Sequence, residues 1–171
     1  TFLTKRFDRQ GKQRLHFSSA MTQLQYYDGE QSQGASDLEI AEFLCTQGAQ
    51  TEADLAQLWR RIIFNIAVSN TDDHLRNHGF LLTKNGWKLS PAYDLNPIVG
   101  KSGLHLNITE TDNALKYQLA FEVKELFRLS QNQATQIYDE VLVAVNQWKI
   151  VAKRLGISRA EQAIKAAAFN L

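Results

Sequence analysis

One polar segment stands out in the chain: Ser69-Asn70-Thr71-Asp72-Asp73-His74-Leu75-Arg76-Asn77-His78-Gly79. It combines two carboxylates, two imidazoles, two carboxamides and an arginine, and it lies between an apolar helical pattern and a strand pattern. Polar segments held by regular structure on both sides commonly carry binding or catalytic residues. Asp72 and Asn77 are five positions apart, which is the Asp-x-x-x-x-Asn spacing of a protein-kinase catalytic loop.

The residues that follow predict a β-hairpin over about 79–89. An apolar run, 79–83, is followed by Asn85-Gly86, which is the strongest short-range signal for a hairpin turn, and the strand pattern then returns over 87–89. In protein kinases the aspartate that holds Mg²⁺ comes just after such a hairpin. We therefore expect Asp94 to meet Asp72 and Asn77 at one end of a two-stranded ribbon.

These residue types suit phosphoryl transfer. The carboxylate of Asp72 can accept or orient the proton of an attacking hydroxyl group. Asn77 offers a neutral oxygen to a hard cation and Asp94 offers a charged one, and Mg²⁺ prefers one or two carboxylates together with waters and phosphate oxygens. An alternative that the same residue types leave open is a metal-dependent phosphodiester hydrolase that uses Asp72, His74, His78 and Asp94.

Two segments, 70–77 and Leu89-Ser90-Pro91-Ala92-Tyr93-Asp94-Leu95, resemble the C-terminal lobe of HipA-like serine/threonine kinases, the toxin halves of bacterial toxin–antitoxin pairs. The opening segment, 4–9, resembles the hinge of these kinases, which touches the adenine. The resemblance implies a mainly α fold with a small β-hairpin, as the C-terminal lobe of a kinase-like α+β protein. It divides the chain into a hinge-like segment (1–17), helices (18–68), the catalytic loop, hairpin and metal aspartate (69–95), an activation-segment-like loop (96–113) and C-terminal helices (114–171).

The resemblance also implies ATP and Mg²⁺ as cofactors and assigns roles to single residues. Asp72 would be the catalytic base, and Asn77 and Asp94 would hold the metal ion. The nucleotide would be bound by Lys5, Arg6, Phe7, His74, Leu75, Arg76, Asn77, Tyr93 and Asp94. The family often has an acidic residue where Lys5 stands, so a hinge contact at that position would come from the backbone.

Partners follow from the same resemblance. They are a HipB-like, DNA-binding antitoxin, an N-terminal kinase lobe expected upstream of Thr1, and a protein substrate such as an aminoacyl-tRNA synthetase or another translation factor. The chain contains no Gly-rich phosphate loop and no strand lysine paired with a helix glutamate. Because phosphoryl transfer needs both lobes, we expect the chain alone to be inactive. The alternative is a non-catalytic module or pseudokinase that binds the antitoxin.

Composition is that of an ordinary soluble domain or lobe, with 171 residues, 44% apolar and 22% charged residues, and a net charge of +1. The charge balance argues against independent binding to nucleic acid. Cys45 is the one cysteine, which excludes an internal disulfide and suits the cytoplasm. It is predicted to be buried on an apolar helical face. No run approaches the ~18 apolar residues of a membrane span, and no signal peptide is visible.

Several polar residues near the central segment have structural interpretations. Asn65, in the helix before it, is predicted to be satisfied by a local partner. Asp73 is predicted to cap or to form an ion pair. Arg76 fits a phosphate contact and an ion pair equally well. His74 and His78 have the spacing of zinc ligands on a helix, but Gly79 and the strand pattern argue against a helix there.

The remaining patterns predict short elements along the chain. An extended segment is expected over 1–9, a strand over 14–17 and an extended stretch over 104–108, and 28–34 is expected to be a loop. Trp87 is expected to pack in the hairpin and Trp148 in the core or an interface. Helices are expected over 18–25, 37–47, about 51–68, 114–129, 130–156 and 158–169. Thr51-Glu52-Ala53-Asp54 is expected to cap the third of them.

Overall fold

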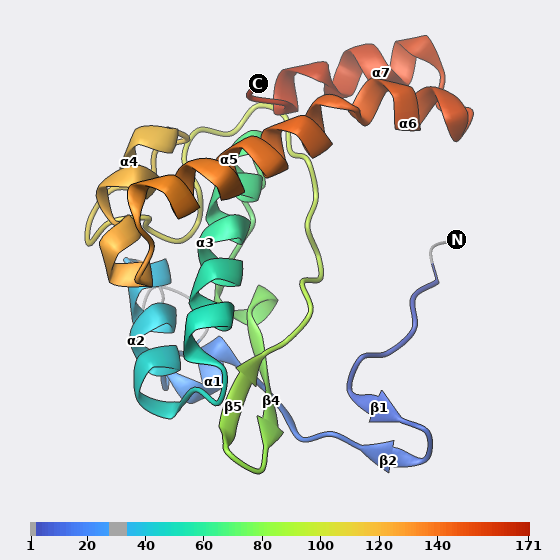
Figure 1. Ribbon diagram of the computed structural model, residues 1–171. Coiled ribbons are helices and arrows are strands. Elements are labelled where there is room, and N and C mark those ends of the chain that lie inside the picture. Colours follow the sequence, from blue (N-terminus) through green and yellow to red (C-terminus); the bar gives the residue numbers. More distant parts are fainter. Residues whose placement is uncertain (1–2, 28–33) are drawn as a thin grey trace.

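A computed structural model describes residues 3–27 and 34–171, and helices make up about half of the chain (Figure 1). The strands are β1 (Arg9–Gln10), β2 (Gln13–Arg14), β3 (Phe17–Ser19), β4 (Gly79–Thr83) and β5 (Gly86–Leu89). The α-helices are α1 (Ala20–Gln23), α2 (Asp37–Gln47), α3 (Thr51–Ala67), α4 (Tyr117–Glu122), α5 (Gln131–Asn146), α6 (Trp148–Arg154) and α7 (Arg159–Lys165). The short 3₁₀ helices are η2 (Leu75–Asn77), η3 (Lys124–Phe127) and η4 (Ala166–Ala168).

The predicted hairpin is confirmed. Strands β4 and β5 pair antiparallel with Thr83 opposite Gly86, so Lys84 and Asn85 are the two loop residues and Gly86 is the first residue of β5. The strand expected over 14–17 lies two or three residues later, as β3, and it adds a third strand on the other side of β4. Strands β1 and β2 form a separate small hairpin that lies away from the helices, near the described start of the chain (Figure 1). Trp87 packs in the sheet region as expected, with its ring near those of His16, Phe43 and Phe80.

Helix α3 is the centre of the core, and α2, α4 and α5 lie against it (Figure 1). Its predicted apolar stripe is buried almost completely, and each such side chain contributes about 1.5–3 kcal/mol. The indole nitrogen of Trp59 donates a hydrogen bond to the carbonyl of Ala120 (2.9 Å), which joins α3 to α4. The stripe consists of Leu55, Leu58, Ile62, Ile63 and Ile66.

The chain end is fixed to the end of α3. Residues after α5 leave the body as α6 and α7 and return through η4 (Figure 1). There the rings of Trp148 and Phe169 stack, with centroids 4.1 Å apart. The backbone nitrogen of Asn170 donates to the carbonyl of Ala67 (2.8 Å), the last residue of α3. Trp148 is half-buried by this stack and is not part of the core cluster, so its expected place in the core or an interface stays a prediction.

Three expected elements differ in extent. The helix expected over 114–129 is shorter and is split into α4 and η3, and the helix expected over 130–156 is divided at Gln147, which ends α5 and precedes α6. Residues 104–108 form no strand. Their apolar side chains alternate into the core, but the backbone has a single bridge, between Ser36 and Asn107, because α2 and not a strand lies beside it.

Two local expectations are corrected. Cys45 is exposed, because the buried stripe of α2 runs through Ile40, Ala41 and Leu44 and the next position lies about 100° round the helix. Thr51 does not cap α3. Its hydroxyl donates to the carbonyl of Leu44 (3.1 Å) in the preceding helix. The loop expected over 28–34, except Gly34, lies outside the described residues, as do residues 1–2.

We expect Gly48→Ala to destabilise the protein more than Gly100→Ala. A Cβ at Gly48 would lie 2.2 Å from the carbonyl oxygen of Leu44, a backbone clash that costs about 1–3 kcal/mol. Gly100 has φ of +85° but open space around it, so alanine there costs only about 1–2 kcal/mol of left-handed backbone. Thermal melts of both variants test this ranking. A larger loss for Gly100→Ala would contradict the close approach at Gly48.

Candidate functional site

The polar segment is tied to the end of α3 by side-chain amides. Ser69 reverses the chain direction after the helix with φ of 49°, a left-handed conformation that non-glycine residues rarely adopt. The amide nitrogen of Asn70 then donates back to the amide oxygen of Asn65 (3.0 Å), and Asn65 donates to the carboxylate of Asp73 (2.5 Å). The expectation that Asn65 has a local partner is confirmed, and its partners are in the segment itself.

Two residues of the segment form a buried ion pair. The carboxylate of Asp73 lies 2.9 Å from Nε2 of His78, and both side chains are only 2% exposed. The same carboxylate oxygen accepts from Asn65, so it has two partners. The expectation that Asp73 forms an ion pair is therefore confirmed. His78 precedes β4 directly, so the pair joins the segment to the sheet.

A second carboxylate and a guanidinium surround this pair. Ligand atoms of Asp37, Asp73 and His78 all lie within 4.8 Å of one another. Arg61 of α3 is also buried and donates to the backbone carbonyl of Ser90, just after β5. Helices α2 and α3 thus send charged side chains to the point where Asp73 and His78 meet.

Burial and neighbouring charges shift the pKa values in this cluster. Burial raises the pKa of Asp37 to about 7. Burial alone would lower the pKa of His78, but the carboxylates of Asp73 and Asp37 outweigh that effect and raise it above its ordinary value. Below about pH 7 Asp37 therefore keeps its proton, and a protonated His78 and Arg61 lie near the carboxylate of Asp73. Although the three ligand atoms are close enough to share a metal ion, we interpret the cluster as a structural network that needs none.

Asp72 and Asn77 are joined across the loop. The amide nitrogen of Asn77 donates to the backbone carbonyl of Asp72 (3.1 Å). Asn77 is buried, whereas the side chain of Asp72 is exposed. The two neighbouring aspartates are thus opposite in environment, since Asp73 is buried and paired. The exposed carboxylate is the one that can reach a ligand.

Tyr93 brings the next predicted site residue to the loop. Its hydroxyl donates to the carbonyl of Arg76 (2.6 Å), and burial raises the pKa of that hydroxyl to about 12. Asp94 follows with φ of 56° and an exposed side chain, and its Oδ1 accepts from the amide of Asn96 (2.9 Å). A left-handed non-glycine residue costs about 1–3 kcal/mol and often marks a functional position. Among the described residues no hydrogen bond joins Asp94 to Asp72.

The hinge-like segment reaches the site through one ring. Phe7 stacks on Tyr93, with ring centroids 5.8 Å apart, and lies 5.9 Å from the ring of Phe17. Lys5 and Arg6 are exposed, and Arg6 is bound to Asp8 through two hydrogen bonds of 2.8 and 2.6 Å. Of the three predicted hinge residues, the structure brings only Phe7 to the rest of the site.

The other predicted residues divide between surface and core. Nε2 of His74 lies 3.3 Å from Nη2 of Arg76. Leu75 is buried in the hydrophobic core, so only its backbone could contact a ligand. His74 and His78 flank η2 and have different partners, so they do not form the zinc-like pair. The ring of His105 lies edge-on to that of His74, with centroids 5.8 Å apart.

Four residues near the site were not predicted from the sequence. Asp37 follows Ser36 at a helix start, where an acidic residue has an ordinary explanation. Arg61 lies among the apolar residues of α3, and that position inside a buried stripe was the available signal. Ser90 takes part through its backbone carbonyl, which carries no sequence signal. His105 alternates with buried Leu104 and Leu106, which could have placed it on the opposite face.

Comparison with known families gives one match that covers most of the chain. The sequence model described as HipA-like C-terminal domain matches residues 1–149. Both segments that carry the resemblance, and all predicted site residues, lie inside this range.

A curated protein of Haemophilus influenzae, named "Putative kinase", is 34% identical over 101 residues, which cover 54% of this chain and 29% of the relative. Among solved structures, a chain of the Shewanella oneidensis MR-1 toxin–antitoxin complex of HipA, HipB and operator DNA matches with a TM-score of 0.75. That match has 19% identity and covers 96% of this chain and 45% of the other. The chain thus spans less than half of the length of either relative. Among the described residues, no helix has the length and apolar character needed to cross a membrane.

The buried cluster predicts how stability depends on pH. Between the ordinary pKa of Asp37, 3.8, and its value in the fold, about 7, the folded protein keeps a proton that the unfolded chain releases. The free energy of unfolding therefore falls as pH rises through this range. The raised pKa of His78 acts in the same direction, because its contribution is full below 6.5 and is lost above it. We expect Asp37→Asn to remove on the order of 2 kcal/mol of the loss between pH 5 and 8.

Urea denaturation of the wild type and of Asp37→Asn at several pH values measures this difference. Asp139→Asn is the matched control, because Asp139 is exposed on α5 and should leave the pH dependence unchanged. Parallel curves for the wild type and Asp37→Asn would show that the buried carboxyl does not hold the extra proton.

Proposed function

Because this chain belongs to the family of HipA-like C-terminal domains, we propose that it is the catalytic C-terminal lobe of a serine/threonine protein kinase. In this proposal the γ-phosphoryl group of ATP moves to a hydroxyl group of a protein. The observation that carries it is the contrast between the two adjacent aspartates, with Asp73 buried and paired and Asp72 exposed and held by Asn77. A kinase catalytic loop needs this combination of a fixed backbone and one accessible carboxylate.

Asp72 is the proposed base. Its backbone is fixed from one side by Asn77 and from the other by Asp73, which is bound to His78. A carboxylate held in this way can accept a hydrogen bond from the incoming hydroxyl group and orient its oxygen for attack. Because the loop is already ordered, little of this orientation has to be gained when the substrate arrives.

Asn77 and Asp94 are the proposed metal ligands, and the donor set fits Mg²⁺. Since the nitrogen of Asn77 is used as a donor to Asp72, its oxygen is left to accept or to bind a cation. Asp94 supplies an exposed carboxylate. One carboxylate and one amide oxygen, completed by waters and phosphate oxygens, are typical for Mg²⁺. When bound, the ion would neutralise charge on the phosphates.

The nucleotide would lie on the side of Tyr93. Phe7 of the hinge-like segment stacks on Tyr93, and this pair is where the segment meets the site. We place the adenine beside this pair, with backbone groups of Lys5 and Arg6 as hydrogen-bonding partners. His74, Arg76 and the backbone at Leu75 would face the phosphates, since they lie between Asp72 and Asn77 along the loop.

A HipB-like antitoxin is the proposed partner, and the cytoplasm is the proposed compartment. This partner is suggested by the structural relative, which is a complex of HipA with HipB and operator DNA. A non-catalytic module that only binds an antitoxin is the second candidate, and it would use the same fold without phosphoryl transfer. The hydrolase is less well supported, because it requires His78, and the structure has this side chain buried against Asp73.

In the full-length protein that carries this lobe, Asp72→Asn should lower phosphoryl transfer by about 10²-fold or more, since it removes the base. ATP affinity should change little, because the carboxylate acts on the acceptor hydroxyl and not on the nucleotide. Autophosphorylation and ATP binding, measured on the same preparation, test this expectation.

Asp73→Asn is the informative comparison. It removes half of a buried ion pair and should lower the melting temperature, whereas Asp72→Asn at an exposed position should not. Transfer near the wild-type rate by Asp72→Asn would reject Asp72 as the base. No transfer by the wild-type full-length protein would favour the antitoxin-binding module.

Asp94→Ala should raise the Mg²⁺ requirement of phosphorylation more than Asn77→Ala, by about tenfold or more, because a carboxylate brings a full charge to the cation and an amide only a dipole. Asp94→Asn separates charge from backbone strain, since asparagine tolerates the left-handed φ of 56° at this position.

Magnesium titrations of the phosphorylation rate, with thermal melts of each variant, distinguish a ligand from a turn-forming residue. A raised Mg²⁺ requirement in Asp94→Asn at unchanged melting temperature supports the metal role. A larger rise for Asn77→Ala than for Asp94→Ala would reverse the ranking.

A further inference from the structure

Helices α6 and α7 form an arm with an unusual surface. Each has only seven residues, and helices this short are marginal without packing, since isolated helices need about 12–15 residues. Within the arm, α7 buries no residue and α6 buries only Ala152. Three large apolar side chains are nevertheless more than two-thirds exposed, namely Ile150 (70%), Leu155 (68%) and Ile164 (68%).

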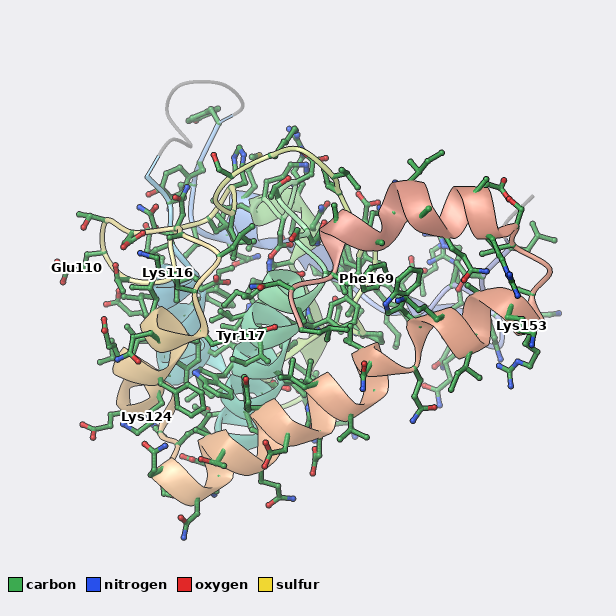
Figure 2. All side chains as sticks on the ribbon, turned by 90° about the horizontal axis from the view of Figure 1, so that it is seen from above. Glu110, Lys116, Tyr117, Lys124, Lys153 and Phe169 are labelled. Carbon is green, nitrogen blue, oxygen red and sulfur yellow. The ribbon has the colours of Figure 1, made fainter. Side chains whose placement is uncertain are left out.

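A groove of about 410 Å³ runs between the arm and the end of α3. Helix α6 contributes residues spaced three and four apart, so one continuous helix face lines it. Pro97 and Phe169 close it on the side of the body, and Figure 2 shows Phe169 where the arm returns. The lining is mostly apolar and includes Val68, Trp148, Val151, Leu155, Ile157 and Phe169.

The arm is basic, whereas the rest of the chain is acidic. Residues 147–171 contain five basic residues and one acidic residue, a net charge of +4. Because the whole chain carries +1, the remaining 146 residues carry −3. Lys149, Lys153 and Arg154 are exposed on α6, outside the face that lines the groove. Figure 2 shows Lys153 near the turn between the two helices.

We propose that this groove binds an amphipathic, acidic α-helix of a partner protein. The apolar face of such a helix fills the groove between α6 and the body, as in helix-in-groove recognition. The acidic residues beside its apolar face lie against Lys149, Lys153 and Arg154. These charge pairs orient the bound helix and raise its rate of association. The ligand helix also supplies the packing that α6 and α7 lack by themselves.

This surface is separate from the proposed catalytic site. The matched family model ends at residue 149, so nearly the whole arm lies beyond it. No residue that lines the groove belongs to the segment 69–77 or to Tyr93 and Asp94. A partner seated there leaves Asp72 accessible, so docking and phosphoryl transfer can occur together.

A concave apolar surface favours a helix over a lipid bilayer or nucleic acid. A bilayer takes up protruding apolar side chains such as Ile150 and Ile164, whereas Val68, Trp148 and Phe169 line a hollow between two elements. Nucleic acid is bound mainly through cations directed at its phosphates, and a groove lined by Val, Leu and Trp side chains would add little binding energy. The groove is mostly apolar, with Glu161 and Lys165 as its charged lining residues and the exposed Lys149, Lys153 and Arg154 beside it. A helix with one apolar and one acidic face matches this surface.

Three fluorescent peptides of about 15 residues test the proposal on the whole chain. The first has leucines at i, i+3, i+4 and i+7 with glutamate elsewhere. The second replaces every glutamate with lysine, and the third scrambles the first so that no apolar face remains. By fluorescence anisotropy we expect the first to bind at least about tenfold more tightly than either other peptide, and less tightly at high salt.

Protein variants locate the contact. Val151→Asp should abolish binding through the groove floor, and the double change Lys153→Glu with Arg154→Glu should weaken it by about fivefold or more. Lys84→Glu, in the exposed turn of the β4–β5 hairpin, is the matched control and should leave affinity unchanged. Each variant should keep the wild-type melting temperature, since all the changed side chains are at least partly exposed.

Each opposing result overturns the proposal in a defined way. Equal binding of the acidic and basic peptides, or no binding of the acidic one, rejects charge-matched helix docking. Sedimentation that shows a dimer of the chain, lost in Val151→Asp, assigns the groove to a second copy. Binding to phosphatidylglycerol vesicles but not to the acidic peptide assigns the arm to a membrane surface. Equal weakening by Lys84→Glu shows that the attraction is only the overall charge.

Discussion

The buried pair of Asp73 and His78 is the interaction on which the candidate site depends. It joins the polar segment to the start of β4, and Asn65 joins the same carboxylate to α3. Breaking one partner of such a pair leaves a charge unpaired in the interior, which typically costs about 3–5 kcal/mol. The loop therefore cannot move far unless the surrounding structure unfolds. Because Asp73 is fixed in the interior, the backbone of its neighbour Asp72 is fixed as well.

The two aspartates illustrate how one dipeptide serves stability and chemistry at once. Successive residues in an irregular loop point in different directions, so one carboxylate can face the core while the next faces solvent. Asp73 is compensated by His78, with Arg61 and Asp37 close by, and Asp72 needs no compensation because water surrounds it. The loop begins with the left-handed turn at Ser69, and the hydrogen bond from the side chain of Asn77 to the carbonyl of Asp72 fixes the backbone at Asp72.

Sequence reasoning succeeded where a pattern is local. The Asn85-Gly86 hairpin signal and the apolar stripe of α3 each report on neighbours a few positions apart, and the structure contains the hairpin and the stripe. It failed where the outcome depends on remote packing. Residues 104–108 alternate like a strand, but α2 lies beside them, and Cys45 missed the buried stripe by one position. Asp37 entered the cluster through tertiary contact, which no local signal reports.

The stack of Trp148 on Phe169 has a consequence for how this fold can vary. Together with the bond from Asn170 to Ala67, it brings the two ends of the α6–α7 excursion to one point on the body. A segment that leaves and returns at the same place can be lengthened, shortened or exchanged at small entropic cost, since each doubling of a flexible loop costs only about 0.6 kcal/mol. We therefore expect the fold to tolerate changes in the length of the arm, and its base offers a junction where foreign segments could be grafted.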